Sequence, residues 1–447
     1  MPRAEPSAPP DGGNGALANI LRNLGQLLAG RAVSAVLALA STALMARALP
    51  PAEFGIVILL HTYALVWNGL FNCKPFEAVI RYGVPALERG DEASLARLVS
   101  ICLRVDIATT LGATVAACLL AGIAGGWLGW SAEVVQLAQI YGLVLLTGVT
   151  GTAKGVLRLY NRFDLLSRQL AIGPLIRFSG AVLVWITGGG IAEFAMAWGA
   201  ALFLEQGYMM QRGWREWHRQ TGAGSLTGLK LEGWREEFPG LARFLGVVYW
   251  QSNLDLVPKH LSTLLVGAVL GSAEAGLFRL AREFSSVLAT PALLLRQVLF
   301  PDFARLWHRG GAGMRWILAR ALGGAGLAGV LIVGVAVTAG APLLGLVAGA
   351  EYRGAAAVLS WLLVAASLDL GASVLRAASY AMGQAGAVLR LNLIALAAYA
   401  ATFLPLTQLM GLTGPGAAAC VSSALMLGGM VSLVARGRPP VALAAGS

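Results

Sequence analysis

Charged residues are scarce in this chain, and their scarcity excludes an ordinary water-soluble protein. Only 12% of the 447 residues are Asp, Glu, Lys or Arg, whereas 57% are hydrophobic and the mean hydropathy is +0.71. A typical soluble domain carries about a quarter charged residues. The composition therefore predicts a membrane protein.

Cysteine is also rare, and the usual sequence marks of an enzyme are missing. The four cysteines, Cys73, Cys102, Cys118 and Cys420, show neither paired nor metal-ligand spacing, which argues against a disulfide framework or a zinc site. The sequence has no Asp-x-Asp cluster, Gly-rich phosphate loop or histidine–carboxylate constellation. We predict that the protein is not an enzyme and uses no metal or other cofactor.

Long apolar runs take up most of the chain. A transmembrane helix needs about 20 mainly apolar residues, and twelve runs meet this requirement. They lie near residues 25–46, 54–72, 99–123, 136–157, 169–187, 191–210, 243–270, 276–298, 316–339, 355–375, 386–408 and 413–435.

The positive charges are distributed unevenly between the connections of these runs. Of 33 Lys and Arg residues, the connections on one side hold only Arg47 and Arg353, whereas those on the other hold about 20, as the positive-inside rule expects of the cytoplasmic side. Both termini are therefore predicted to be cytoplasmic, in a multi-pass protein of the inner (cytoplasmic) membrane whose surroundings are membrane lipids. Topology also explains the net charge of +11, so we expect no nucleic-acid partner.

A short segment occurs twice, each time between two apolar runs. Ala46–Gly55 aligns with Gly267–Gly276 at an offset of about 221 residues, which places Glu53 on Glu274 and Gly55 on Gly276. Duplicated halves with a site between them are typical of transporters. We predict a cytoplasmic tail (1–19), a six-helix bundle (20–210), a cytoplasmic interfacial linker (211–242), a second six-helix bundle (243–435) and a cytoplasmic tail (436–447).

Four short motifs carry a resemblance to a known family. With Ala46–Gly55, Asn253–Asp255, Gly276–Phe278 and Gly349–Tyr352, the chain resembles the polysaccharide-biosynthesis flippases of the multidrug/oligosaccharidyl-lipid/polysaccharide exporter superfamily over roughly residues 20–435. The resemblance implies an all-α fold of about twelve transmembrane helices in two related six-helix bundles. It also implies export of a lipid-linked glycan by alternating access, with polysaccharide polymerase or transferase proteins as further candidate partners.

Charged side chains inside the predicted spans mark the candidate substrate site, because such charges are costly in lipid unless they face a cavity or a partner. The set is net positive and suits a diphosphate, which favours guanidinium and ammonium donors. We predict a central cationic cavity formed by His61, Arg177, Lys259, Arg279 and Arg282, with Asp255 and Glu283 as supporting carboxylates.

Other roles for these residues stay open. Asp255 with Lys259, and Arg279 with Glu283, are i, i+4 pairs that could serve only to pack the bundle, or take part in ion coupling. His61 could be a hydrogen-bonded interior histidine or a proton-sensitive contact. Asp106 is expected to reach interface water.

Three functions compete. The favoured one is a flippase for a polyprenyl-diphosphate-linked oligosaccharide or related glycan lipid in envelope polysaccharide biosynthesis, with linker 211–242 absorbing the rocking of the two bundles. The alternative within transport is a cation-coupled multidrug or small-solute exporter, for which interior carboxylates should outnumber cations. A membrane glycosyltransferase would need an acidic metal site or a large outer loop, and the sequence has neither.

Overall fold

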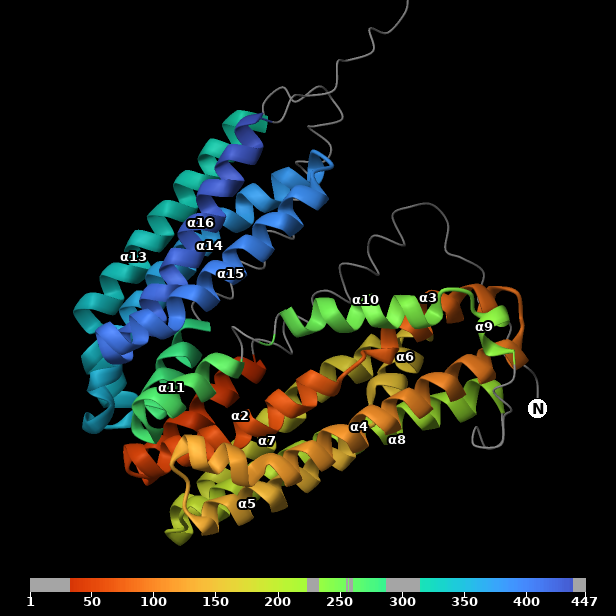
Figure 1. Ribbon diagram of the computed structural model, residues 1–447, viewed down its shortest axis with the longest axis horizontal. Helices are drawn as coiled ribbons and strands as arrows, with labels where there is room; N and C mark the ends of the chain where they lie inside the picture. The colour runs from red at the N-terminus through yellow and green to blue at the C-terminus, as the bar shows by residue number, and fades with distance from the viewer. Residues whose placement is uncertain (1–32, 223–232, 255, 257–259, 287–313, 437–447) are drawn as a thin grey trace, which may run out of the picture.

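The computed structural model describes residues 33–222, 233–254, 256, 260–286 and 314–436, and these residues form helices and no strand (Figure 1). Seven of these helices are long and apolar enough to cross a membrane. Each of the twelve predicted spans falls, in whole or in part, on a described helix. The predicted fold class, an all-α polytopic membrane protein with its helices in two bundles, is confirmed.

The longest helix of the first bundle has clear start and stop signals. This helix, α4 (Glu92–Leu128), begins where the Asp91 carboxylate accepts the Ser94 N–H at 2.9 Å and ends at Gly129, whose φ of 66° favours glycine. It therefore starts earlier than the predicted span. The other elements are the helix Val33–Ala48, α2 (Pro51–Phe71), α3 (Pro75–Glu88), α5 (Ala132–Leu143), η1 (Val144–Gly148), α6 (Gly151–Leu159), α7 (Phe163–Thr187) and α8 (Ile191–Thr221).

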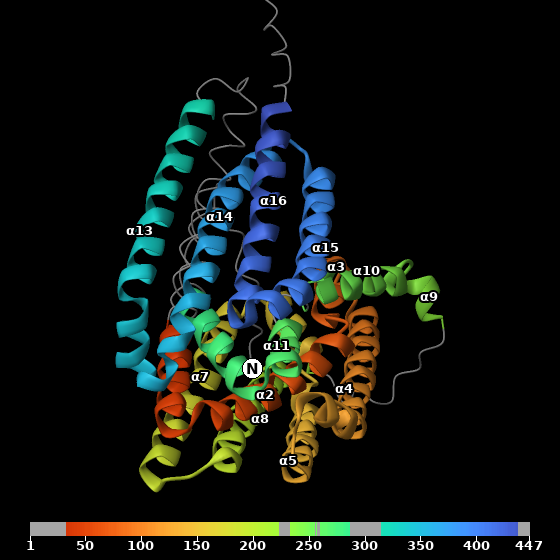
Figure 2. The same cartoon turned by 60° about the vertical axis from the view of Figure 1, so that its left-hand side comes forward.

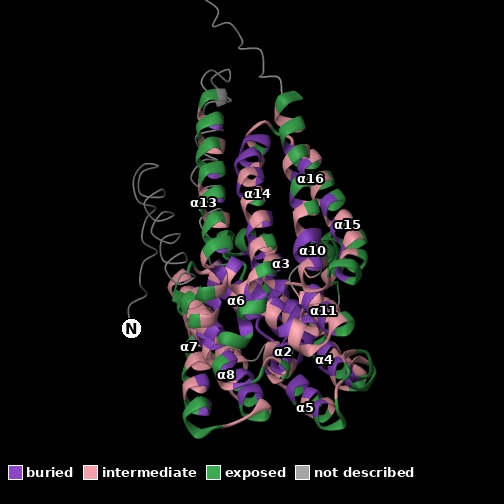
Figure 3. Cartoon of the chain, turned by 90° about the vertical axis from the view of Figure 1, so that its left-hand side faces the viewer, coloured by how far each residue is buried: buried purple, intermediate pink, exposed green. Residues whose placement is uncertain are grey.

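The second bundle contains four long helices that pack in pairs. Helix α14 (Ala355–Ala381) packs against both α13 (Met314–Ala348) and α16 (Gly414–Arg436), and α15 (Ala385–Met410) packs against α16 (Figure 2). Exposed residues cover much of α13 (Figure 3), and many of them are apolar, as lipid contact requires. The bundle also includes α11 (Ser262–Leu270), the helix of residues 272–286, η4 (Ala350–Gly354) and η5 (Gly411–Thr413).

The two copies of the repeated segment contact one another where the bundles meet. A Cβ atom on Gly55 would lie 1.7 Å from the Ser272 carbonyl oxygen, and one on Gly276 would lie 3.2 Å from the Gly55 Cα atom. Close by, the Tyr352 hydroxyl donates to the Leu49 carbonyl at 3.0 Å. Only glycine allows the two backbones to approach this closely.

The seventh predicted span is divided between the bundles. Its first part, α10 (Leu241–Leu254), contacts α2 and α3 of the first bundle, whereas α11 lies where the bundles meet (Figure 1). The linker before α10 is also attached to the first bundle, because Glu237 pairs with Arg97 at 2.8 Å and the Tyr82 hydroxyl donates to the Pro239 carbonyl at 3.2 Å. The described part of the linker therefore has contacts that hold it to one half.

Glu216, near the end of α8, is buried among donors at the predicted cytoplasmic side. Its side chain is 4% exposed and accepts hydrogen bonds from Arg162, Arg219 and Gln220. Burial by itself would raise the pKa of this carboxyl, but hydrogen bonds from Gln220 and Arg219 and the positive charges of Arg162 and Arg219 outweigh it and hold the pKa below its usual value. Glu216 therefore stabilises the folded state above its unfolded pKa of about 4.3, and this contribution is lost as pH falls through the lower folded pKa.

Replacing Glu216 by glutamine is expected to lower the free energy of unfolding at pH 7 by about 1–3 kcal/mol, because the Arg162, Arg219 and Gln220 donors lose a buried, charged acceptor. The variant should also lose less stability than the wild type between pH 5 and pH 3. Thermal unfolding of the purified protein in detergent measures both effects. Glu236→Gln, at an exposed position, is the matched control; equal acid sensitivity of Glu216→Gln and wild type would contradict the prediction.

Candidate functional site

His61 lies buried in the first bundle and is held by aromatic neighbours. It comes from α2, its Nδ1 atom is 2.8 Å from the Tyr141 hydroxyl oxygen, and its ring meets that of Trp198 edge to face at 4.7 Å between centroids. The side chain is 4% exposed. The structure thus shows His61 as a hydrogen-bonded interior histidine that faces the predicted site from α2.

Arg177 reaches the same aromatic cluster from α7. Its guanidinium carbon lies 5.6 Å from the centroid of the Trp198 ring, which fits a cation–π contact. The Arg177 Nε atom is buried and has no hydrogen-bond partner among the described residues. Its charge interacts with those of Glu205, Arg279 and Glu283. An arginine held this way keeps a donor available for an anion.

Arg279 and Glu283 form the predicted i, i+4 ion pair in the helix of residues 272–286. The Arg279 Nε atom is 3.6 Å from a Glu283 carboxylate oxygen, and their side chains are 21% and 12% exposed. The same oxygen accepts a hydrogen bond of 3.1 Å from the Thr42 hydroxyl, in the first helix of the other half. Because 3.6 Å is too long for a hydrogen bond, the Arg279 Nε atom, like that of Arg177, is buried without one.

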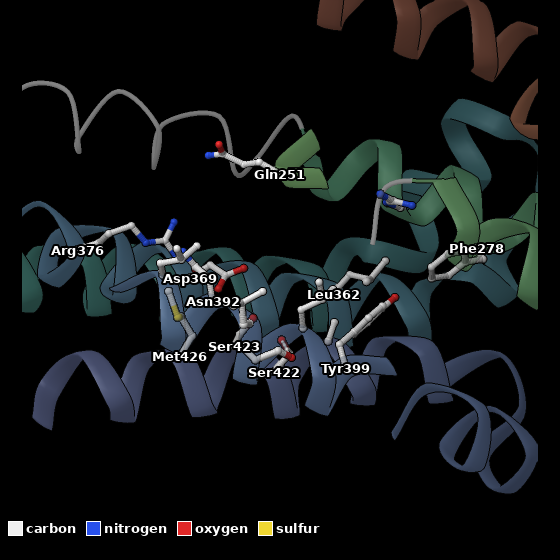
Figure 4. A pocket seen from close by; sticks show the side chains of 16 residues that line it. Gln251, Phe278, Leu362, Asp369, Arg376, Asn392, Tyr399, Ser422, Ser423 and Met426 are labelled. Carbon is white, nitrogen blue, oxygen red and sulfur yellow. Dashed lines mark hydrogen bonds between the residues drawn. The ribbon is translucent and has the colours of Figure 1, made fainter. Parts of the chain in front are cut away.

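Arg282 lies three residues further along and faces a different space. It donates to the Ser262 hydroxyl at 3.0 Å and lines a cavity of about 470 Å³ inside the second bundle (Figure 4). The charge of Arg279 acts on it, so the cavity adjoins the cluster around Arg279.

The structure therefore brings together some of the predicted site residues. His61, Arg177, Arg279 and Glu283 come together from both halves, and Arg282 lies at their edge. The other two predicted residues, Lys259 and Asp255, lie outside the described residues. We refer to His61, Arg177, Arg279 and Glu283 as the central cluster.

The sequence analysis did not include three buried or half-buried charged residues of the first bundle among the candidate site residues. Asp106 was expected to reach interface water, but it is 5% exposed, because it packs against α6 and its carboxylate accepts the Thr152 N–H at 2.8 Å. Lys154 interacts electrostatically with both Asp106 and Glu205, and Glu205 accepts a hydrogen bond of 2.9 Å from Gln169. Lys154 and Glu205 lie inside predicted spans, so the rule that marked Arg177 would have found them too.

The arrangement can hold an anion between two helical halves. Arg177 and Arg279 each have a buried Nε donor without a hydrogen bond to any described residue, and nearby carboxylates balance part of their charge. The described residues contain no cluster of His, Cys, Asp or Glu that could hold a metal ion.

Comparison with solved structures shows which known proteins share this fold. The chain matches an inward-facing multidrug resistance MATE family transporter of the MOP superfamily with a TM-score of 0.68, at 13% identity over 90% of this chain and 95% of that one. It matches the lipid II flippase MurJ, in an inward closed conformation, with a TM-score of 0.65, at 14% identity over 90% of this chain and 85% of that one. The chain therefore shares its fold with both of these proteins.

The sequence gives a closer relationship. Inner membrane protein YghQ of Escherichia coli (strain K12) is 30% identical over 344 residues, which are 76% of this chain and 95% of the relative. The chain belongs to the family of YghQ and is a multi-pass inner membrane protein. No family model matches the chain.

Proposed function

We propose that this protein is a flippase that moves a polyprenyl-diphosphate-linked oligosaccharide or related glycan lipid across the inner membrane for envelope polysaccharide biosynthesis. The observation that supports this most is the pair of half-buried arginines, Arg177 and Arg279, whose buried Nε atoms have no hydrogen-bond partner among the described residues. Buried cations with available donors need an anion to complete them. In this proposal both termini are cytoplasmic, and polymerase or transferase proteins are candidate partners.

The two halves of the central cluster suggest how the cargo is carried. Arg177 comes from the first bundle, whereas Arg279 comes from the helix of residues 272–286 in the second. A diphosphate between them would contact both bundles while its lipid tail stayed in the bilayer. Glu283, joined to Thr42 of the opposite half, would hold Arg279 in place when no cargo is bound.

The tight contact between the repeated segments supports alternating access. Gly55 and Ser272 lie on connections that the charge distribution assigns to the outer side, and their backbones leave no room for a side chain. In this proposal the observed state is closed to the outside, in keeping with the fold match to an inward-facing transporter. Export then requires this contact to open.

A cation-coupled multidrug or small-solute exporter is the second candidate. The interior carboxylates Asp106, Glu205, Glu283 and Asp369 favour it, because a cationic drug or coupling ion would need such groups. Against it, the described interior groups also include the five cations Lys154, Arg177, Arg279, Arg282 and Arg376. The flippase remains the better match to this balance.

Leaflet-specific labelling of lipid-linked glycan in cells lacking this protein separates the two candidates. A flippase requires the glycan lipid to accumulate in the inner leaflet and to return to the outer leaflet when the wild type is re-expressed. If the outer-leaflet glycan is unchanged in the deletion strain, the flippase proposal is wrong and an exporter of small solutes takes its place.

A further inference from the structure

The cavity that Arg282 borders lies inside the second bundle and has the size of a ligand site. Its volume is about 470 Å³, within the range of roughly 300–1,000 Å³ typical of small-molecule sites. The helix of residues 272–286, α14, α15 and α16 line this partly open space, and Gln251 of α10 reaches it from the opposite side (Figure 4). It is therefore a space between helices of the second bundle and the end of α10.

Both hydrogen-bond donors and hydrogen-bond acceptors line this cavity, and they lie within the membrane-spanning part of the second bundle. Asp369, in the middle of α14, is exposed to it; the Ser423 hydroxyl hydrogen-bonds to the Asp369 carboxylate, and the charge of Arg376 acts on that carboxylate. Asn392 of α15 adds an amide that can donate and accept. Figure 4 shows Asp369, Asn392, Ser423 and Arg376 grouped at one end and Tyr399 at the other.

This set of groups suits an uncharged polar ligand with many hydroxyls better than a second phosphate. A carboxylate at Asp369 repels an anion, and Arg376 is already engaged with it electrostatically. Hydroxyl groups of a ligand can donate to the carboxylate and exchange hydrogen bonds with the Asn392 amide. A polar lining inside a membrane is costly unless a ligand or water satisfies it.

The cavity also begins where the central cluster ends. Arg279 and Arg282 are three residues apart on one helix, a spacing that makes them neighbours. Arg282 then reaches Ser262 at 3.0 Å, and Ser262 also hydrogen-bonds to Tyr399 at the cavity wall. A ligand with a diphosphate at Arg279 and a sugar attached to it would therefore extend past Arg282 into the cavity.

We propose that this cavity binds the first sugars of the cargo, with Asp369 and Asn392 as the residues that recognise their hydroxyl groups. The proposal rests on the proposed flippase function and adds a place for the glycan. The central cluster holds the diphosphate, and the cavity distinguishes a glycan lipid from a bare prenyl diphosphate.

Protection of a cysteine in the cavity wall tests the proposal. The four native cysteines are replaced by alanine and Ser422→Cys, a change of similar size at the lining, is introduced into the full chain. Labelling by N-ethylmaleimide is then timed in inner-membrane vesicles from cells that make the lipid-linked glycan and from cells that lack its first sugar transferase. We expect labelling to be at least about fivefold slower in the glycan-containing vesicles. In the vesicles that lack the glycan, adding farnesyl diphosphate, a sugar-free probe, should leave the labelling rate unchanged.

The second variant asks whether the named residues recognise the sugar. Adding Asn392→Ala to Ser422→Cys should abolish the protection by glycan, whereas adding Ser373→Ala, on α14 but not in the cavity lining, should preserve it. Membrane abundance and unfolding temperature of each variant show that it is folded.

Each contrary result overturns the proposal. Equal labelling in both vesicle types, or no labelling in either, means that glycan does not occupy the cavity, and protection by farnesyl diphosphate alone means that the cavity takes the phosphate or the lipid. If the deletion strain still accumulates glycan lipid in the inner leaflet, the flippase function survives these results. If it does not, the function itself has failed.

Discussion

Replacing Arg279 by alanine is expected to reduce glycan-lipid transport about ten- to a hundredfold without preventing membrane insertion. A hydrogen bond to a charged group contributes about 1.5–3 kcal/mol, and each 1.4 kcal/mol is a factor of ten in affinity. Arg279 lies between the halves, and its Nε atom has no hydrogen-bond partner among the described residues. The hydrogen bond that the alanine variant loses should therefore be one to the cargo. Leaflet-specific labelling in the deletion strain, with each variant re-expressed, measures the rate.

Two substitutions serve as controls for the Arg279 result. Arg279→Lys keeps the charge but lacks the guanidinium fork, so transport should fall less than with alanine. Arg320→Ala removes an exposed arginine that lies over Trp316 on α13, and transport should stay near the wild-type rate. Full transport by both Arg279→Ala and Arg177→Ala would return the central cluster to a purely structural role.

Replacing Gly55 by alanine is expected to destabilise the protein and to impair transport. The new Cβ atom would lie 1.7 Å from the Ser272 carbonyl oxygen, so the backbones must move apart. Overpacking of this kind costs about 1–3 kcal/mol, and it acts on the contact that closes the proposed outer side. Thermal unfolding in detergent and the leaflet assay measure the two effects.

Gly122→Ala is the matched control, because Gly122 lies on α4 and a Cβ atom there meets nothing within 4 Å. Alanine should stabilise this helix slightly, by about 0.5–1 kcal/mol, and leave transport unchanged. The prediction for Gly55 is wrong if its alanine variant unfolds at the wild-type temperature and transports at the wild-type rate.

The helices and their order could be predicted because apolar runs and the repeated segment are local properties of the sequence. The prediction also found Arg177 and Arg279, since a charge inside an apolar run stands out without any knowledge of the fold. It did not include α3, whose residues lie between two predicted spans, nor the association of α10 with the first bundle. Both depend on packing between helices.

The pairing of the interior charges could not be predicted for a related reason. Thr42 and Glu283 are 241 residues apart, and helical periodicity indicates which face a residue occupies but not which helix it meets. Asp106 shows the same limit, because its position suggested interface water and only the neighbouring Thr152 explains its burial. The cavity around Asp369 likewise depends on how α14, α15 and α16 pack.

The contact between Gly55 and Gly276 also locates the axis that relates the two halves. Equivalent positions of a duplicated chain can touch only where that axis passes, so it runs between these two glycines. His61 and Arg282 are equivalent as well, each six residues further along its helix. The same position of the repeat therefore carries a histidine in the first half and an arginine in the second, so that two helices of one repeat present different chemistry.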